Sequence, residues 1–296
     1  MPSTPFDSQK SIDWLQNNRR TFLFLSFQRV NYHILDFQKK KVVAASLSWG
    51  SKSVFMEPKV LGHFKSYVLG FLNSEPSEEA YLFLHGFPAN KGNKNKDLAA
   101  KLFSELKKDA FLIHYRGLGQ SQGSFSFSHS IKESIETAKE ILIYGKYQKI
   151  NIYGHSWGSV VACNVANEVA SQTRNLILAC PLTKIVLDSP VLTSLVSETV
   201  KEMPGVFGIQ TIEDVKKDLL KLTAGQPWDL APRLNMRVSI IQALRDAYTP
   251  PLDTRLFLER FESRPHYIEL DLDHSFMDNR PMFVEVVVKE FERMLR

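Results

Sequence analysis

The stretch KINIYGHSWGSVVACNVA, residues 149–166, passes from a strand-like run into a helix-like run within a few residues. Its first part alternates apolar residues, and its last part is made of small and apolar residues. Between them, Ser156 stands in the pattern Gly154-x-Ser156-x-Gly158. A tight strand-to-helix turn needs small residues whatever its function, but it also exposes a serine hydroxyl in front of a helix N-terminus. The pattern alone leaves packing and chemistry both open.

Short apolar runs that end in polar or glycine residues occur on both sides of this stretch. They cover residues 80–86, 110–117, 176–181, 237–246 and 266–274. Runs this continuously apolar are typical of strands buried on both faces, as in a parallel sheet. Helical patterns lie between them at 130–145, 250–261 and 281–295. The alternation predicts an α/β fold, with a doubly wound, mostly parallel β-sheet flanked by helices.

The alternation breaks between residues 182 and 235, where three glycines interrupt the chain and no good strand pattern occurs. We interpret this segment as a helical cap insertion rather than as a second domain. Two further strand patterns, at 41–49 and 65–73, open the core. The predicted organisation is an N-terminal extension with some helix over 1–40, a first core part over 41–181, the cap over 182–235 and a second core part over 236–296.

The composition restricts the possible partners. With 296 residues, 44% of them hydrophobic, the chain can bury one large core. The net charge of +5 is small for this length, and no basic stripe with interleaved aromatics predicts nucleic-acid binding. The lysine-rich stretch at 90–108 is better explained as a loop and a solvated helix than as a binding patch. The charge would assist approach to an anionic lipid surface, so transient membrane contact stays open, although surface lysines commonly serve only solubility.

The two cysteines, Cys163 and Cys180, stand in apolar surroundings and show no metal-type spacing. Buried thiols suit a reducing compartment. Near the N-terminus, NNRRTFLFLSF at 17–27 superficially resembles a twin-arginine export signal. Its apolar run is interrupted at Gln28, is too short to span a membrane and precedes no small-residue cleavage site. We therefore expect a cytoplasmic protein.

Residues with chemical potential follow the predicted strands. In an open α/β sheet, ligands bind beyond the carboxyl ends of the strands. Ser156, Asp246 and His274 appear in this order along the chain, each at the end of a separate predicted strand. HGFP at 85–88 and YRGLGQS at 115–121 follow two earlier strands. Chance rarely produces this arrangement.

Together these motifs resemble the α/β-hydrolase superfamily, in its esterase, lipase, lysophospholipase and serine peptidase branch, over residues from about 65 to 296. The resemblance implies Ser156 as nucleophile, His274 as general base and then acid, and Asp246 as the residue that orients the imidazole. It also implies a cap where 182–235 breaks the alternation, and neither a metal nor a cofactor.

The implied roles follow from acyl-transfer chemistry. A serine hydroxyl is a poor nucleophile near neutral pH, so it needs an adjacent base held in the right tautomer. The oxyanion of the tetrahedral intermediate needs fixed donors. The family pattern implies the backbone N–H groups of Trp157, which follows the nucleophile, and of Phe87, which follows His85 and Gly86.

Other polar residues have simpler explanations. His85, Gly86 and His155 are candidates for substrate contact, although structural or hydrogen-bonding roles suit the strand-end histidines better, and the same holds for His114. Asp271 and Asp273 lie close to His274 in sequence, but a neighbour on one strand rarely meets the adjacent ring. Asp188 and Asp229 border the cap and suit surface or capping roles. Arg116 is better explained as a loop organiser than as a substrate clamp.

Three functions compete. The first is a serine hydrolase that cleaves a carboxylic ester or thioester through an acyl-enzyme, with a small-molecule ester or acyl lipid such as a lysophospholipid or monoglyceride as substrate. An apolar cap would favour long acyl chains, but cap helices are also apolar because they pack on the core.

The second is a peptidase or aminopeptidase, for which Glu198, Glu202, Glu213 and Asp214 offer acidic anchors. The third is a non-catalytic binding module, which usually loses a residue of the triad or elbow. The oligomeric state is not readable from the sequence.

Overall fold

The computed structural model describes residues 29–32, 45–49, 52–54, 67–73, 77–88, 95–119, 121–208, 210–222 and 225–296. Most of the predicted extension over 1–40, including the helix expected there and the export-like stretch at 17–27, lies outside these residues. In the N-terminal part, three short strands form a separate antiparallel sheet: β1 (Arg29–Tyr32), β2 (Ala45–Trp49) and β3 (Lys52–Val54). Strand β2 falls within the strand predicted at 41–49.

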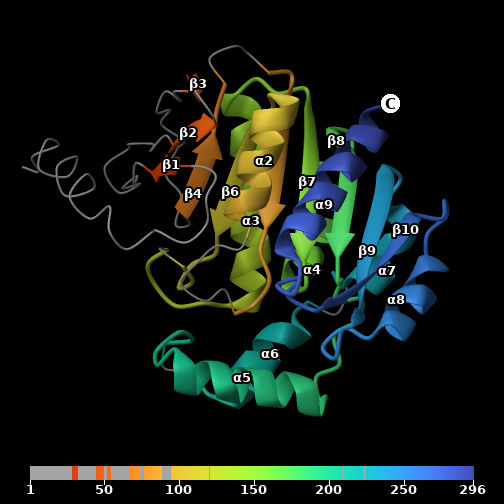
Figure 1. The fold of residues 1–296 in the computed structure, drawn as a ribbon. Helices are drawn as coiled ribbons and strands as arrows, with labels where there is room; N and C mark the ends of the chain where they lie inside the picture. The colour runs from red at the N-terminus through yellow and green to blue at the C-terminus, as the bar shows by residue number, and fades with distance from the viewer. Residues whose placement is uncertain are drawn as a thin grey trace, which may run out of the picture.

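A seven-stranded sheet forms the centre of the molecule (Figure 1). Its strand order is β10-β9-β8-β7-β5-β6-β4, and every neighbouring pair is parallel except β4 with β6. The strands are β4 (Tyr67–Phe71), β5 (Glu79–Leu84), β6 (Asp109–His114), β7 (Lys149–His155), β8 (Thr173–Ala179), β9 (Arg237–Arg245) and β10 (His266–Asp273). The predicted doubly wound α/β fold is confirmed.

Burial explains the hydrophobic pattern of these strands. Every residue of β5 and β6 is buried, because both strands lie inside the sheet and helices cover both faces. Continuous apolar runs are therefore required there. Strand β10 is an edge strand, and Glu269 and Asp271 remain exposed on it.

The helices cover the sheet from two sides. Helices α2 (Lys96–Leu106) and α9 (Arg280–Leu295) pack together on one face, and α3 (Phe127–Tyr144) and α4 (Trp157–Glu168) pack together on the other (Figure 1). Helix α8 (Pro251–Leu258) follows β9. Within the described part of the chain, no helix combines the length and hydrophobicity needed to cross a membrane.

The segment between β8 and β9 forms the cap. It contains α5 (Pro190–Glu202), α6 (Ile212–Leu220), α7 (Pro227–Leu230) and a 3-10 turn at Ala231–Arg233. Helices α5 and α6 lie beyond the carboxyl ends of β7 and β8 (Figure 1). Because loops at these strand ends form the ligand site of an open α/β sheet, the cap lies over that site.

Several contacts fasten the cap to the core, and a buried carboxylate and an aromatic side chain are among them. The buried carboxylate of Asp218 on α6 accepts hydrogen bonds from the Ser126 hydroxyl at 2.8 Å and from the backbone N–H of Ser128 at 3.2 Å, as well as from the Ser128 hydroxyl. These serines stand at the N-terminus of α3, where a carboxylate is favoured by the helix dipole. The cap residue Phe207 packs against Phe87, with ring centroids 5.7 Å apart. The cap is thereby tied to the strand-end loops.

Candidate active site

The site lies where the chain changes direction across the sheet. Strand β5 lies between β6 and β7. After β5 the chain therefore continues toward one edge of the sheet, and after β7 it continues toward the opposite edge. In open α/β folds this switch point creates a crevice outside the carboxyl ends of the strands. The loop after β5 contains His85, Gly86 and Phe87, and the turn after β7 contains Ser156.

Backbone packing explains the two glycines around Ser156. A Cβ atom added to Gly154 would lie 2.3 Å from the carbonyl oxygen of Gly158, and one added to Gly158 would lie 2.3 Å from the carbonyl oxygen of Leu84. Neither distance is compatible with a side chain. Ser156 itself has φ 54°, in the left-handed region that costs energy for a residue other than glycine. This strained turn is the sharp elbow that the sequence predicted.

Hydrogen bonds hold the backbone of the elbow on both sides. The Ser156 N–H donates to the carbonyl oxygen of Ala179 on β8 at 3.0 Å, and the Ser156 carbonyl accepts from the backbone N–H of Ser159 at 2.9 Å and from its hydroxyl at 2.5 Å. Ser156 is the N-cap residue of α4. Its side chain is therefore located at the positive end of a helix dipole.

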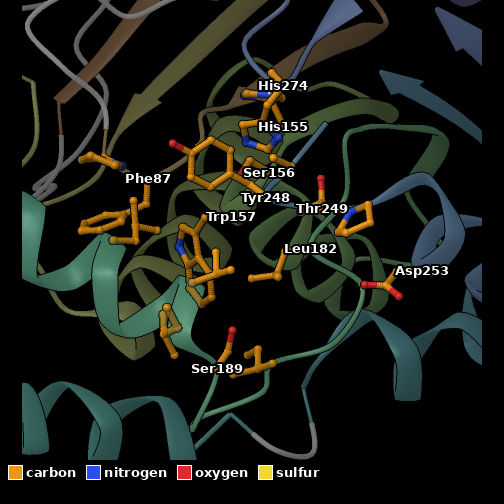
Figure 2. A pocket seen from close by; sticks show the side chains of 18 of the residues that line it. Phe87, His155, Ser156, Trp157, Leu182, Ser189, Tyr248, Thr249, Asp253 and His274 are labelled. Atoms are coloured by element: carbon orange, nitrogen blue, oxygen red, sulfur yellow. Dashed lines mark hydrogen bonds between the residues drawn. The ribbon is translucent and has the colours of Figure 1, made fainter. Parts of the chain in front are cut away.

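A histidine–aspartate pair comes from the two strands at the edge of the sheet. His274 follows β10 and Asp246 follows β9, and Nδ1 of His274 donates to Oδ2 of Asp246 at 2.7 Å. His274 and Ser156 both line the same cavity (Figure 2). The structure thus brings together the three residues that the sequence singled out.

The Asp246 carboxylate is surrounded by donors. Its Oδ1 accepts the backbone N–H groups of Tyr248 at 2.8 Å and Thr249 at 2.9 Å, and its Oδ2 accepts the Thr249 hydroxyl at 2.7 Å. Burial raises the pKa of this carboxyl, but the hydrogen bond and charge of His274 and the N–H of Thr249 outweigh it, so the pKa falls to about 2. Asp246 is therefore ionised at neutral pH.

Sequence analysis missed the groups that support Asp246. The thiol of Cys180, at the end of β8, hydrogen-bonds to the Asp246 carboxylate, and burial raises the pKa of this thiol well above its ordinary value. Gln242 on β9 donates to the carbonyl of Thr249 at 3.0 Å and accepts from the Thr254 hydroxyl at 2.6 Å. Cys180 is far from Asp246 in the sequence, and no sequence motif marks either Cys180 or Gln242 as a supporting residue.

The two strand-end histidines at the site are held by backbone groups. His155 donates from Nε2 to the carbonyl of His274 at 2.8 Å, and burial and the neighbouring His274 lower its pKa to about 3. His85 donates from Nδ1 to the carbonyl of Gly86 at 2.7 Å, and burial lowers its pKa to about 4. Both residues line the cavity, so substrate contact stays a prediction, but each already has the hydrogen-bonding role that the sequence favoured.

The loop after β5 comes very close to the elbow. A Cβ atom added to Gly86 would lie 3.1 Å from Cβ of Ser156, so a larger residue would push the two segments apart. Phe87 follows in the same loop and is fixed by stacking on Phe125, with ring centroids 4.7 Å apart. Trp157 is the first residue of α4, and the first N–H groups of a helix have no partner within it. Its indole donates to Ser130 at 3.0 Å.

The cavity has a volume of about 690 Å³ and lies between the strand-end loops and the cap. Its lining divides into two parts. The part toward the cap is mainly apolar and includes Phe127, Trp157, Leu182, Ile185, Val186, Val191, Leu192, Leu195 and Leu219. The part next to His274 is polar and includes Arg245, Tyr248, Asp273 and Ser275. In Figure 2, Trp157 and Leu182 lie on the opposite side of Ser156 from His274.

The alternative acids predicted from sequence have other partners. Asp271 accepts from Arg245 at 2.8 Å, and Asp273 accepts from the Ser275 hydroxyl at 2.5 Å. Asp188 is exposed, and Asp229 accepts from Gln226 at 2.6 Å. Arg116 forms an ion pair with Glu133 at 3.3 Å, as expected for a loop organiser.

The acids offered for a peptidase lie away from the cavity. Glu198, Glu202, Glu213 and Asp214 are all exposed, and none of them lines it. Asp214 instead forms a capping box with Thr211 at the start of α6. The expectation that these residues could anchor a peptide terminus is therefore wrong for this cavity.

A possible metal-binding group in the described residues overlaps this site. One ligand atom each of His155, Cys180 and His274 lie within 4.8 Å of one another. Nε2 of His155 is engaged with the His274 carbonyl, and the Cys180 thiol is engaged with Asp246. A metal-binding cysteine has to be deprotonated, which the raised pKa of Cys180 opposes.

Comparison with known proteins places this geometry in a family. The family model described as alpha/beta hydrolase fold matches residues 81–233. Protein bem46 of Schizosaccharomyces pombe (strain 972 / ATCC 24843) is 32% identical over 123 residues, 40% of each chain. Lysophosphatidylserine lipase ABHD12 of Xenopus tropicalis is 29% identical over 107 residues, 35% of this chain and 28% of that protein. The chain therefore matches less than half the length of these two relatives.

Among solved structures, the esterase EaEST from Exiguobacterium antarcticum superposes with a TM-score of 0.58 at 17% sequence identity. The superposition covers 77% of this chain and 95% of that one. This likeness supports the fold. The sheet, the strand-end site and the cap define a hydrolase-type enzyme fold. Since the family model matches more than half of its residues, the chain belongs to the alpha/beta hydrolase fold family.

Proposed function

We propose that this protein is a serine hydrolase that cleaves a carboxylic ester through an acyl-enzyme intermediate. The observation that carries the proposal is the 2.7 Å hydrogen bond from His274 to the ionised Asp246. His274 lines the same cavity as Ser156, the serine of the elbow. This combination supplies a nucleophile, a base in a defined tautomer and a carboxylate that stabilises the protonated base.

In the first half-reaction, His274 takes the proton of the Ser156 hydroxyl through Nε2 as the serine oxygen attacks the ester carbonyl. Nδ1 keeps its proton, because Asp246 accepts it. The carbonyl oxygen becomes an oxyanion, for which the backbone N–H groups of Trp157 and Phe87 are the proposed donors. When the tetrahedral intermediate collapses, the C–O bond to the alcohol breaks, and His274 returns its proton to the alkoxide.

In the second half-reaction, a water molecule attacks the acyl-enzyme. His274 takes one proton from the water, and the same donors hold the second oxyanion. Collapse breaks the bond to Ser156, whose oxygen regains a proton from His274, and releases the carboxylic acid. Each step uses the same residues, so one arrangement serves both halves of the reaction.

The lining of the cavity supports an acyl lipid or other apolar acyl ester as substrate. The alcohol part has to lie beside His274, which protonates it, so the acyl chain is placed on the other side of Ser156, toward Trp157, Leu182 and the cap (Figure 2). That part of the cavity is apolar, and burial of each CH₂ group there contributes about 0.8 kcal/mol. The names of two similar proteins, an esterase and a lysophosphatidylserine lipase, agree with ester substrates.

The peptidase alternative has less support. The acids offered for it do not line the cavity, although the fold accommodates both reactions. The binding-module alternative would leave the strain at Ser156 and the donors around Asp246 without a purpose. We therefore rank the esterase first.

The test is hydrolysis of p-nitrophenyl esters from acetate to palmitate, by the wild type and by Ser156→Ala. We expect wild-type turnover to fall by at least about 10³-fold in the variant, because residual catalysis by the oxyanion donors and binding is small. Labelling of Ser156 by a fluorophosphonate, located by peptide mass spectrometry, identifies the nucleophile. Absence of both turnover and labelling in folded protein would favour the binding module.

A further inference from the structure

The two sides of Ser156 differ in charge as well as in polarity, and this difference bears on the alcohol part of the substrate. A role for this difference depends on the proposed esterase function. His274 has to protonate the leaving alkoxide, so the alcohol part of the ester lies beside His274. The residues around that position are Arg245, Tyr248, Asp273 and Ser275, which all line the cavity.

Arg245, which lines this part of the cavity, already has two carboxylate partners. Nε of Arg245 donates to Oδ1 of Asp271 at 2.8 Å, and a terminal guanidinium nitrogen lies 2.8 Å from Oδ2 of Asp278. A terminal nitrogen also donates to the backbone carbonyl of Asp271 at 3.0 Å. An anionic head group would therefore have to compete with two carboxylates that are already in place.

A third carboxylate adds to the negative charge. Asp273 directly precedes His274 and accepts the Ser275 hydroxyl at 2.5 Å and the Met277 N–H at 2.9 Å. Burial raises the pKa of Asp273, but these hydrogen bonds outweigh it and the pKa is lowered. Asp271 and Asp278 thus pair with Arg245, and Asp273 stands opposite Arg245 in the strand register, next to His274. Among the described residues at this position, carboxylates outnumber the one guanidinium, although the whole chain carries +5.

Among the residues that the structure describes, the other charged side chains lining the cavity do not reverse this sign. Lys184 and Asp253 line it on the cap and α8 side, with one charge each and of opposite sign. The Lys184 ammonium lies over the ring of Trp228, 5.9 Å from its centroid. In Figure 2, Asp253 lies on the side of Leu182 and not beside His274.

We infer that the enzyme, unlike a lipase for lysophosphatidylserine with its anionic head group, selects esters whose alcohol part is a neutral or cationic polar group, such as a glycerol or choline ester. It rejects anionic head groups. The selection follows from the pairing of Arg245 with Asp271 and Asp278 and from the further carboxylate of Asp273 beside His274. Like charges placed together at an interface disfavour a partner, and this effect is strongest at low ionic strength.

The test compares esters that share one acyl chain: 1-octanoylglycerol, octanoylcholine and 1-octanoylglycerol 3-phosphate. We expect kcat/KM for the phosphate to be at least about tenfold below that for octanoylglycerol at low salt, and the difference to shrink in about 0.5 M NaCl. Equal or faster hydrolysis of the phosphate by the wild type would overturn the inference.

The variant Asp271→Asn/Asp278→Asn removes the two carboxylates from Arg245 and leaves the triad intact. We expect kcat/KM for the phosphate to rise by about tenfold and that for octanoylglycerol to stay within about twofold. The matched control is Glu136→Gln/Glu262→Gln, which makes the same change of net charge at two exposed positions outside the cavity. This control should not change the ratio of the two substrates.

The outcomes separate the two proposals. If none of the esters is hydrolysed by folded protein, the proposed esterase function fails. If octanoylglycerol is hydrolysed in a Ser156-dependent way but the phosphate is cleaved equally well, the function stands and the head-group selection is wrong. If the Asp271→Asn/Asp278→Asn variant and the control change the ratio equally, the net charge and not Arg245 sets the selectivity, and the inference is overturned.

Discussion

Nε2 of His155 donates a hydrogen bond to the backbone carbonyl of His274, with the two atoms 2.8 Å apart. The bond ties the residue before the elbow serine to the residue proposed as general base, so the ends of β7 and β10 are joined across two intervening strands. The rings of the two histidines also pack together, with centroids 5.1 Å apart. His155 is thus placed to position His274 relative to Ser156.

Replacing His155 tests this positioning role. We expect His155→Leu to lower kcat by about 10²-fold, because a misplacement of the order of 1 Å costs that much, with a smaller change in KM. His155→Gln can still donate to the carbonyl and should recover part of kcat. If both variants lose activity only in proportion to lost folded protein, measured by circular dichroism, the residue is merely structural.

The glycines of the elbow should be intolerant of any side chain. Gly154→Ala and Gly158→Ala each place a Cβ 2.3 Å from a carbonyl oxygen, and we expect each to lower the free energy of unfolding by about 1–3 kcal/mol or more. Gly70→Ala is the control, since its Cβ would meet no atom closer than 3.6 Å. Urea titration measures all three, and equal stability among them would contradict the steric explanation.

Acid should reduce the contribution of Asp246 to stability. Its pKa in the folded protein is about 2, below the ordinary value of 3.8. A lowered carboxyl pKa stabilises the folded state above the ordinary value, and this stabilisation is lost as the pH falls toward the folded-state value. We expect the stability difference between the wild type and Asp246→Asn to shrink from pH 4 to pH 2, as measured by urea unfolding. A difference independent of pH would contradict this prediction.

The cap should loosen when its buried carboxylate is neutralised. Asp218→Asn replaces an acceptor of three hydrogen bonds at the N-terminus of α3 by an amide, at an expected cost of about 1–3 kcal/mol. Hydrogen exchange read out by mass spectrometry should show faster exchange in α5 and α6 than in the sheet. Glu213→Gln, at an exposed position on α6, is the matched control. Equal exchange in both variants would argue against Asp218 as the fastening point.

Filling the apolar part of the cavity should shorten the preferred acyl chain. Leu195 lines the cavity from α5, whereas Val200 on the same helix does not line it and is 44% exposed. We expect Leu195→Trp to move the optimum of the p-nitrophenyl ester series to shorter chains, with long-chain kcat/KM reduced by about tenfold. Val200→Trp should leave the profile unchanged. A parallel shift in both variants would mean that the chain does not lie under α5.

The fold could be predicted from residue order because its signals are local. Strands buried on both faces require continuous apolar runs, such as 110–117, and the elbow requires glycine where an added Cβ atom would lie 2.3 Å from a carbonyl oxygen. Likewise, Asp246 and His274 were singled out because each follows a predicted strand. Parallel strands bring their carboxyl ends to one edge of a sheet, so position along the chain predicts proximity in space.

The surroundings of those residues depended on tertiary contacts. Cys180 and Asp246 are 66 positions apart in the sequence, and so their hydrogen bond has no local signature. The same holds for the bond from His155 to the His274 carbonyl and for the pairing of Arg245 with Asp271 and Asp278. Charge and packing at a site arise from segments that only folding brings together. Periodicity and motifs therefore predicted the scaffold and the residues proposed to react, while only the tertiary structure decided which side chains lie around them.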